Sequence, residues 1–113
     1  MRDGMDGGLW YWPEDQEEQR KVLYQISRSK FIRQALESLA KNAIGLSNSE
    51  LDDAIGANSN WLTLWVARQL LALGLVVYKV DLFGGPGKYQ LTERGKEIVK
   101  KISSLSATAG AHE

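Results

Sequence analysis

The sequence predicts a mostly helical α+β fold, in which amphipathic helices come before and after one two-stranded β-hairpin. Apolar residues recur at helical spacing between residues 13 and 73, and the pattern changes to alternation between residues 75 and 83. A chain of 113 residues is long enough for one hydrophobic core and too short for two. We therefore expect a single domain over residues 13–105.

Residues 1–12 are expected to form a flexible N-terminus that ends in an aromatic segment. Three glycines occur in residues 1–8, and Leu9-Trp10-Tyr11-Trp12 follows them. Large apolar side chains are unfavourable in water, so this segment should be covered. Two arrangements are open: the segment packs over the domain's own core, or it forms a strap across a dimer partner.

Two helices are expected next, over residues 13–27 and residues 29–42. Proline suits a first helical turn, and acidic residues favour the positive N-terminal end of a helix. Apolar residues follow at core spacing in both segments. The polar segment Ser27-Arg28-Ser29 is either a break between two helices or a turn within one longer helix.

A short helix and a longer helix follow. Ser47 and Glu50 have the spacing of a capping box, which predicts a helix over residues 48–55. The segment Asn58-Ser59-Asn60 offers three successive caps for a helix over residues 58–73. A glycine comes directly after each of the two helices, as is typical of helix ends.

The alternating pattern predicts a hairpin over about residues 75–92, with a Gly-Gly-Pro-Gly turn at residues 84–87. Thr92 can cap a last amphipathic helix over about residues 93–105. Residues 106–113 are small and polar, so we expect a disordered tail there.

This order of elements predicts a winged helix-turn-helix. A short helix joined to a longer one by a tight glycine-containing turn is the helix-turn-helix unit, here over about residues 48–73. The hairpin that follows makes the wing. The expected architecture is a three-helix core plus a two-stranded β-hairpin wing, with additional N- and C-terminal helices.

Three segments carry a resemblance to a known family. They are Ser49-Glu50-Leu51-Asp52-Asp53-Ala54-Ile55-Gly56, Leu70-Leu71-Ala72-Leu73-Gly74-Leu75-Val76 and Lys88-Tyr89-Gln90-Leu91-Thr92-Glu93-Arg94-Gly95-Lys96. In this order they resemble the helix-turn-helix, the entry to the wing and the exit from the wing of winged-helix regulators. The chain is most similar in general to archaeal MarR- and ArsR-like DNA-binding proteins. That resemblance implies a transcription regulator that forms a homodimer through its terminal helices.

Duplex DNA is the expected partner, with the helix over residues 58–73 in the major groove and residues 84–88 on the backbone or minor groove. Small polar and basic side chains at a helix start, on the helix and on a wing suit bases and phosphates. The candidate DNA-binding residues are Asn58, Ser59, Asn60, Thr63, Arg68, Lys79, Lys88 and Arg94. The net charge of the chain is zero, but residues 58–105 hold seven basic and three acidic side chains.

A protein–protein interaction module is the alternative. Helical spacing gathers Leu62, Val66, Leu70 and Leu73 on the core side of the third helix, and it places Trp61, Leu64, Arg68 and Leu71 roughly opposite, with Trp65 flanking. A DNA-reading helix is usually more polar on its outer side. The candidate protein-interface residues are Trp10, Trp12, Trp61, Leu64 and Trp65.

Neither an enzyme nor a metal protein is expected. The chain has no cysteine and one histidine, His112, which excludes disulfides and thiolate zinc sites and leaves no histidine cluster. The glycine-rich segment at residues 84–88 lacks the strand–loop–helix layout of a phosphate loop. We expect no cofactor.

No apolar run approaches the roughly 20 residues that span a bilayer, and residues 1–8 do not resemble a signal peptide, so a cytoplasmic protein is expected.

Overall fold

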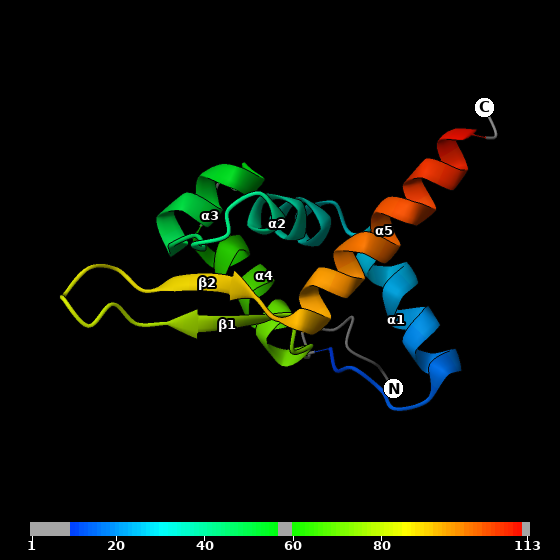
Figure 1. The fold of residues 1–113 in the computed structure, drawn as a ribbon, viewed down its shortest axis with the longest axis horizontal. Helices are drawn as coiled ribbons and strands as arrows, with labels where there is room; N and C mark the ends of the chain where they lie inside the picture. The colour runs from blue at the N-terminus through cyan, green and yellow to red at the C-terminus, as the bar shows by residue number, and fades with distance from the viewer. Residues whose placement is uncertain (1–9, 57–59, 112–113) are drawn as a thin grey trace.

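The computed structural model describes residues 10–56 and 60–111, with side chains for residues 10–56 and 61–104. Its elements run in the order α1 (Gln16–Arg28), α2 (Lys30–Ala40), α3 (Asn48–Ile55), α4 (Asn60–Ala72), β1 (Val76–Lys79), β2 (Lys88–Leu91) and α5 (Glu93–Ala111). In the described residues the fold is therefore five helices and one antiparallel hairpin, which confirms the predicted winged helix-turn-helix (Figure 1).

The segment around Ser29 is a break between two helices. Ser29 is extended, with φ −87° and ψ 110°, and its N–H donates to the carbonyls of Gln25 and Ile26 at the end of α1. The guanidinium of Arg33 donates to the carbonyl of Ser27 and so closes the corner. The chain can thus fold α2 back against α1, which one continuous helix could not do.

Helix α1 begins three residues later than the proline suggested. The side chain of Asp15 accepts a hydrogen bond from the N–H of Glu18 at 3.1 Å, which makes Asp15 the N-cap. Pro13 lies before the helix and is buried. The acidic first turn that follows suits the helix dipole, as expected.

The helix-turn-helix is held by local contacts. The Ser47 side chain accepts from the N–H of Glu50, and the Glu50 carboxylate accepts from the N–H of Ser47, so the predicted capping box is present. Gly56 ends α3 with φ 65°, and Gly74 follows α4 with φ 74°. Both glycines adopt the left-handed conformation that a helix end requires.

The wing is a short hairpin with a long loop. Val76 pairs with Leu91 and Lys79 pairs with Lys88, and beyond that pair the strands separate. The first strand was expected to continue to residue 83 and ends at Lys79. The backbone N–H of Gly84 donates to the carbonyl of Asp81, so the chain turns where a longer strand would run on.

The core lies around α2, which packs against α1, α3, α4 and α5. Its largest fully buried side chains include Ile32, Leu36, Leu51, Leu70 and Ile98. Leu46 adds an isolated bridge to Tyr89 and so ties the start of the helix-turn-helix to β2.

Helix α5 continues to Ala111, beyond its expected end near residue 105. No proline interrupts this segment, and alanine is a strong helix former. Its last turns project from the body of the domain (Figure 1). Over the described residues, no helix combines the length and the apolar character needed to span a membrane.

Candidate nucleic-acid interface

The outward face of α4 carries apolar side chains around one arginine. Trp61, Leu64 and Leu71 are 72%, 44% and 42% exposed, and Arg68 is exposed among them. Leu70 on the opposite side is fully buried. The side of α4 that faces solvent is therefore the side that helical spacing placed opposite the core.

Thr63 lies inside the fold. Its side chain is 3% exposed, and its hydroxyl donates to Oδ1 of Asp52 on α3. Thr63 was expected to contact DNA, but its hydroxyl is buried between two helices in this structure. The signal was present in the sequence, because Thr63 precedes the buried Val66 by three residues and Leu70 by seven, which is core spacing.

The start of α4 is described only by its backbone. Asn58 and Ser59, two of the expected DNA contacts, lie outside the described residues. Asn60 is the first residue of α4, and its side chain also lies outside what the structure describes.

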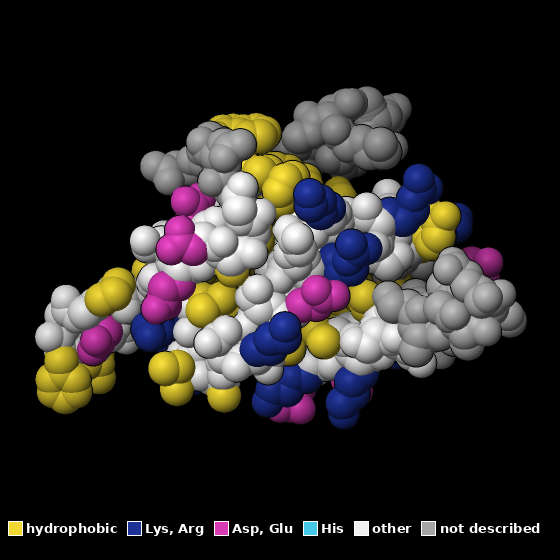
Figure 2. Space-filling view, turned by 90° about the horizontal axis from the view of Figure 1, so that it is seen from above, with side chains coloured by type: hydrophobic (Ala, Val, Ile, Leu, Met, Phe, Trp, Pro, Cys, Tyr) yellow, Lys and Arg dark blue, Asp and Glu magenta, His cyan; other side chains and the backbone are white. Residues whose placement is uncertain are grey.

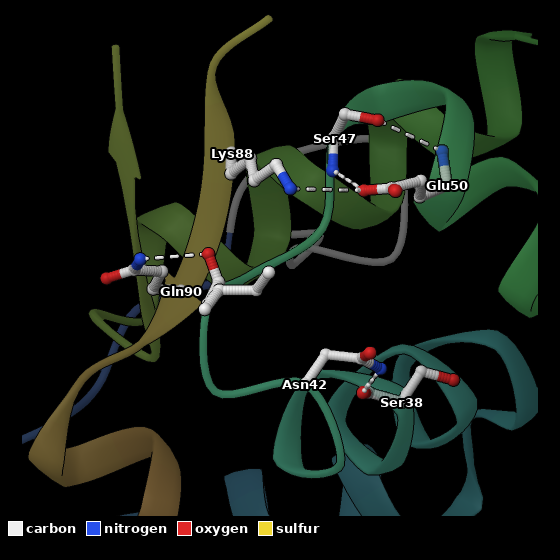
Figure 3. Close-up of polar contacts among 7 residues, drawn as sticks. Ser38, Asn42, Ser47, Glu50, Lys88 and Gln90 are labelled. Carbon is white, nitrogen blue, oxygen red and sulfur yellow. Dashed lines mark hydrogen bonds and ion pairs between the residues drawn. The ribbon is translucent and has the colours of Figure 1, made fainter. Parts of the chain in front are cut away.

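Two lysines face each other across the hairpin at the base of the wing loop. Lys79 and Lys88 are direct cross-strand partners. Lys88 lies 4.0 Å from the carboxylate of Glu50, which is the same carboxylate that closes the capping box (Figure 3). The amide of Gln90 donates to the carbonyl of Ile44 and holds β2 against the segment that leads into α3.

The electrostatics of Glu50 follow from these contacts. Its hydrogen bond from the Ser47 backbone, with a smaller contribution from the positive charge of Lys88, holds the pKa of the carboxyl below its ordinary value. The charged form of Glu50 therefore couples the start of α3 to the base of the wing.

A tyrosine pair stiffens the other face of the hairpin. The rings of Tyr78 and Tyr89 lie 4.8 Å apart at 56°. Burial, aided by Tyr78, raises the pKa of the Tyr89 hydroxyl, and a hydrogen bond with Asn48 opposes that rise. Tyr89 thus connects the wing to the first residue of α3.

The aromatic segment before α1 packs over this chain's own core. The backbone N–H of Trp10 donates to Oε1 of the fully buried Gln69 on α4 at 2.8 Å. The Trp10 ring meets the half-buried Trp65 ring edge to face, with 6.0 Å between centroids. Of the two arrangements left open for this segment, the structure shows the one within a single chain.

Arg94 is engaged in the same region. Its guanidinium donates to the carbonyl of Leu73 at the end of α4 and lies 5.7 Å from the centre of the Trp12 ring. Arg94 was expected to reach DNA from beside the wing. In this structure its contacts join the N-terminal segment, α4 and α5.

The positive charge of the C-terminal half is divided between two regions. Only Arg68, Lys79 and Lys88 lie on α4 and the wing, and the other four basic residues belong to α5. Four acidic side chains lie on α3 and the wing: Glu50, Asp52, Asp53 and Asp81. Figure 2 shows one face on which Lys and Arg side chains gather mostly over the helical body, whereas apolar and acidic side chains lie toward the wing end.

Among the described residues, no group of three or more histidine, cysteine, aspartate or glutamate side chains is placed to hold a metal ion. The surface of α4 and the wing offers three cations, Arg68, Lys79 and Lys88, beside exposed apolar side chains.

Fold and surface define a winged helix-turn-helix protein. No protein-family model and no curated protein matches the sequence. Solved structures do match. One is MepR, a transcription regulator of the Staphylococcus aureus multidrug efflux pump MepA, with a TM-score of 0.70 and 18% identity over 85% of this chain and 70% of that chain.

Two point mutants of MepR match in the same way. One gives a TM-score of 0.71 with 19% identity, covering 85% of this chain and 73% of that chain. The other gives a TM-score of 0.69 with 18% identity, covering 81% of this chain and 67% of that chain. These matches show that the chain has the winged-helix fold of MepR. The archaeal part of the sequence resemblance stays a prediction.

Proposed function

We propose that this chain is a duplex-DNA-binding protein, a transcription regulator that places α4 in the major groove and residues 84–88 of the wing on the backbone or minor groove. The observation that carries the proposal is the lysine pair of the wing. Like charges directly opposite each other on a hairpin are destabilising. Among the described residues, Glu50 lies within ion-pair distance of Lys88 and not of Lys79. A phosphate between Lys79 and Lys88 would relieve their repulsion.

Helix α4 adds the second contact. Arg68 stands on its outward face and can reach phosphate or a guanine edge. In the sequence, Asn58 and Ser59 come directly before Asn60, the first residue of α4, and backbone N–H groups at a helix start favour a phosphate. The fold shared with a transcription regulator supports this assignment.

A homodimer completes the proposal. The terminal helices α1 and α5 pack against each other beside the core, and Tyr24 on α1 is 59% exposed. A two-fold dimer through these helices would set two DNA half-sites about one helical turn apart, roughly 34–36 Å. Such a regulator works in the cytoplasm.

A salt titration of binding to random duplex DNA tests the proposal, with fluorescence anisotropy as the readout. The wild-type chain should bind tightly at low salt and weaken as salt rises. Lys79→Ala and Lys88→Ala should each weaken binding to all sequences alike and reduce the slope of log K against log salt by about 0.9. Lys100→Ala on α5 is the matched control and should leave the slope unchanged. No binding by the wild-type chain at low salt would overturn the proposal.

A protein-assembly role is the second candidate, because Trp61 and Leu64 stand exposed on α4 beside the half-buried Trp65. Analytical ultracentrifugation separates it from the first. The assembly role would be favoured if the wild-type chain self-associates without binding duplex DNA and if Trp61→Ala abolishes that self-association. The assembly role would be excluded if the Trp61→Ala chain still binds DNA and keeps the oligomeric state of the wild-type chain.

A further inference from the structure

The loop at the end of the wing presents two large apolar side chains to solvent. Leu82 and Phe83 are 92% and 97% exposed, and Val80 is 69% exposed. The loop lies at the far end of the hairpin from the helical body (Figure 1), and Figure 2 shows apolar side chains at that end of the molecule. We call Leu82 and Phe83 the wing apex.

A defined turn holds the wing apex outward. The N–H of Gly84 donates to the carbonyl of Asp81 at 3.2 Å, and the N–H of Phe83 donates to the Asp81 carboxylate at 2.8 Å. Leu82 and Phe83 are therefore the two central residues of a β-turn, whose side chains point away from the loop. A side chain at Gly85 would collide with the Asp81 carboxylate, so that carboxylate is folded back against the loop.

Turn chemistry explains the flanking residues but not the apex itself. Aspartate at the first position and glycine at the fourth are typical of such turns, because they supply the side-chain cap and the tight exit. The central positions need no leucine or phenylalanine. With almost all of their surface exposed, these two adjacent side chains add nothing to the core, and a partner that covered them would gain the free energy of burying both.

We propose that the wing apex is a wedge that enters the minor groove of duplex DNA and unstacks one base-pair step. This inference rests on the proposed DNA binding and specifies how the wing reads its partner. Leucine and phenylalanine are among the side chains that minor-groove proteins insert between bases. The flexible pyrimidine–purine steps are the expected targets, because they unstack most easily.

The charges of the wing favour this partner. Lys79 and Lys88 form the base of the loop, with Leu82 three residues beyond Lys79, so phosphate contacts would flank the inserted side chains. Arg68 is the one further cation on α4 and the wing. Three cations give a salt slope of only about −2.7 per protomer, and an apolar contact at the wing apex would add affinity that does not weaken as salt rises.

The shape of the loop favours a groove over a flat protein surface. Residues 84–87 are Gly-Gly-Pro-Gly, so the chain beside Phe83 carries little side-chain bulk. A slim tip of this kind suits the minor groove, which is about 6 Å wide. A stable protein interface buries about 800 Å² on each partner, far more than two side chains at a tip provide.

Fluorescence of 2-aminopurine placed at a TA step tests the wedge, using the full chain and a duplex that it binds. Binding of the wild-type chain should raise the fluorescence, because the base loses its stacking partner. Phe83→Ala should abolish that rise and weaken binding about tenfold at low and high salt alike, leaving the salt slope unchanged. Lys79→Ala should reduce the slope and keep the fluorescence rise. Ile44→Ala, which removes a side chain that is 72% exposed outside the wing, is the control and should behave as wild type.

The outcomes separate the wedge from the proposed function. Binding by the wild-type chain without a fluorescence rise, or a Phe83→Ala chain that still unstacks the step, would overturn the wedge alone. A wild-type chain that does not bind DNA would overturn both. If the wild-type chain does not bind DNA but self-associates, and Phe83→Ala abolishes the self-association, the wing apex binds a protein partner instead. Phe83→Ala should fold normally because this side chain has no buried contacts to lose, and circular dichroism checks this.

Discussion

The hydroxyl of Thr63 donates a hydrogen bond to the carboxylate of Asp52 across the junction of α3 and α4. Thr63 is buried, whereas Asp52 is half-buried at the edge of the same junction. This pair fixes the angle between the two helices of the helix-turn-helix from inside. The orientation of the outward face of α4 therefore depends on Thr63, which is buried and not part of that face.

Replacing Thr63 by valine keeps the shape of the side chain and removes the donor. We expect a loss of about 1–2 kcal/mol in the free energy of unfolding, because a hydrogen bond to a partly buried carboxylate disappears. Urea denaturation measures it. Asp53→Asn, an exposed neighbour on the same helix, is the control and should stay within about 0.5 kcal/mol of wild type. Equal stability of Thr63→Val and wild type would mean that the hydrogen bond does not hold the junction.

Leu70 and Leu71 are adjacent on α4 and differ sharply in burial. Leu70 is fully buried and Leu71 is 42% exposed. Leu70→Ala should lower the free energy of unfolding by about 2–5 kcal/mol, because it leaves a cavity in the core. Leu71→Ala should cost less than about 1 kcal/mol. A reversed order in urea denaturation would show that α4 faces the other way.

The aromatic segment offers a similar pair of neighbours. Trp10 packs on Trp65, whereas Tyr11 is 68% exposed. Trp10→Ala should cost about 1–3 kcal/mol, less than a full core truncation because the ring is only partly buried. The tryptophan fluorescence of the Trp10→Ala chain should shift to longer wavelength, because water reaches Trp65. Tyr11→Ala should change neither quantity, and a similar loss in both variants would refute this packing.

Stability should fall at acidic pH partly through Glu50. Its pKa is lowered in the folded chain, so the unfolded chain binds the proton more readily as pH falls. The contribution of Glu50 is present above its ordinary pKa and disappears as pH falls through the lowered value. Glu50→Gln keeps an oxygen that can accept from the Ser47 N–H but cannot titrate. Its stability, followed by thermal unfolding between pH 7 and pH 3, should fall less steeply than that of wild type. Parallel curves would contradict this role.

The sequence by itself determined the features that form over three or four residues. The Ser47–Glu50 capping box, the left-handed Gly74 and the change of period at the wing all depend on near neighbours, and the structure confirms them. The cap at Asp15 is equally local. It was missed because Pro13 offered a competing start for the same helix.

The tertiary structure alone decided which distant partners hold the polar and aromatic side chains. Thr63 is drawn inward by Asp52, and Trp10 is held by Gln69, which lies 59 residues away in the sequence. Arg94 is held by a carbonyl at the end of α4. Helical spacing gives the direction of a side chain only to within a broad sector. The neighbour that occupies that sector comes from a distant part of the chain, so packing, not periodicity, settles which contacts the residue makes.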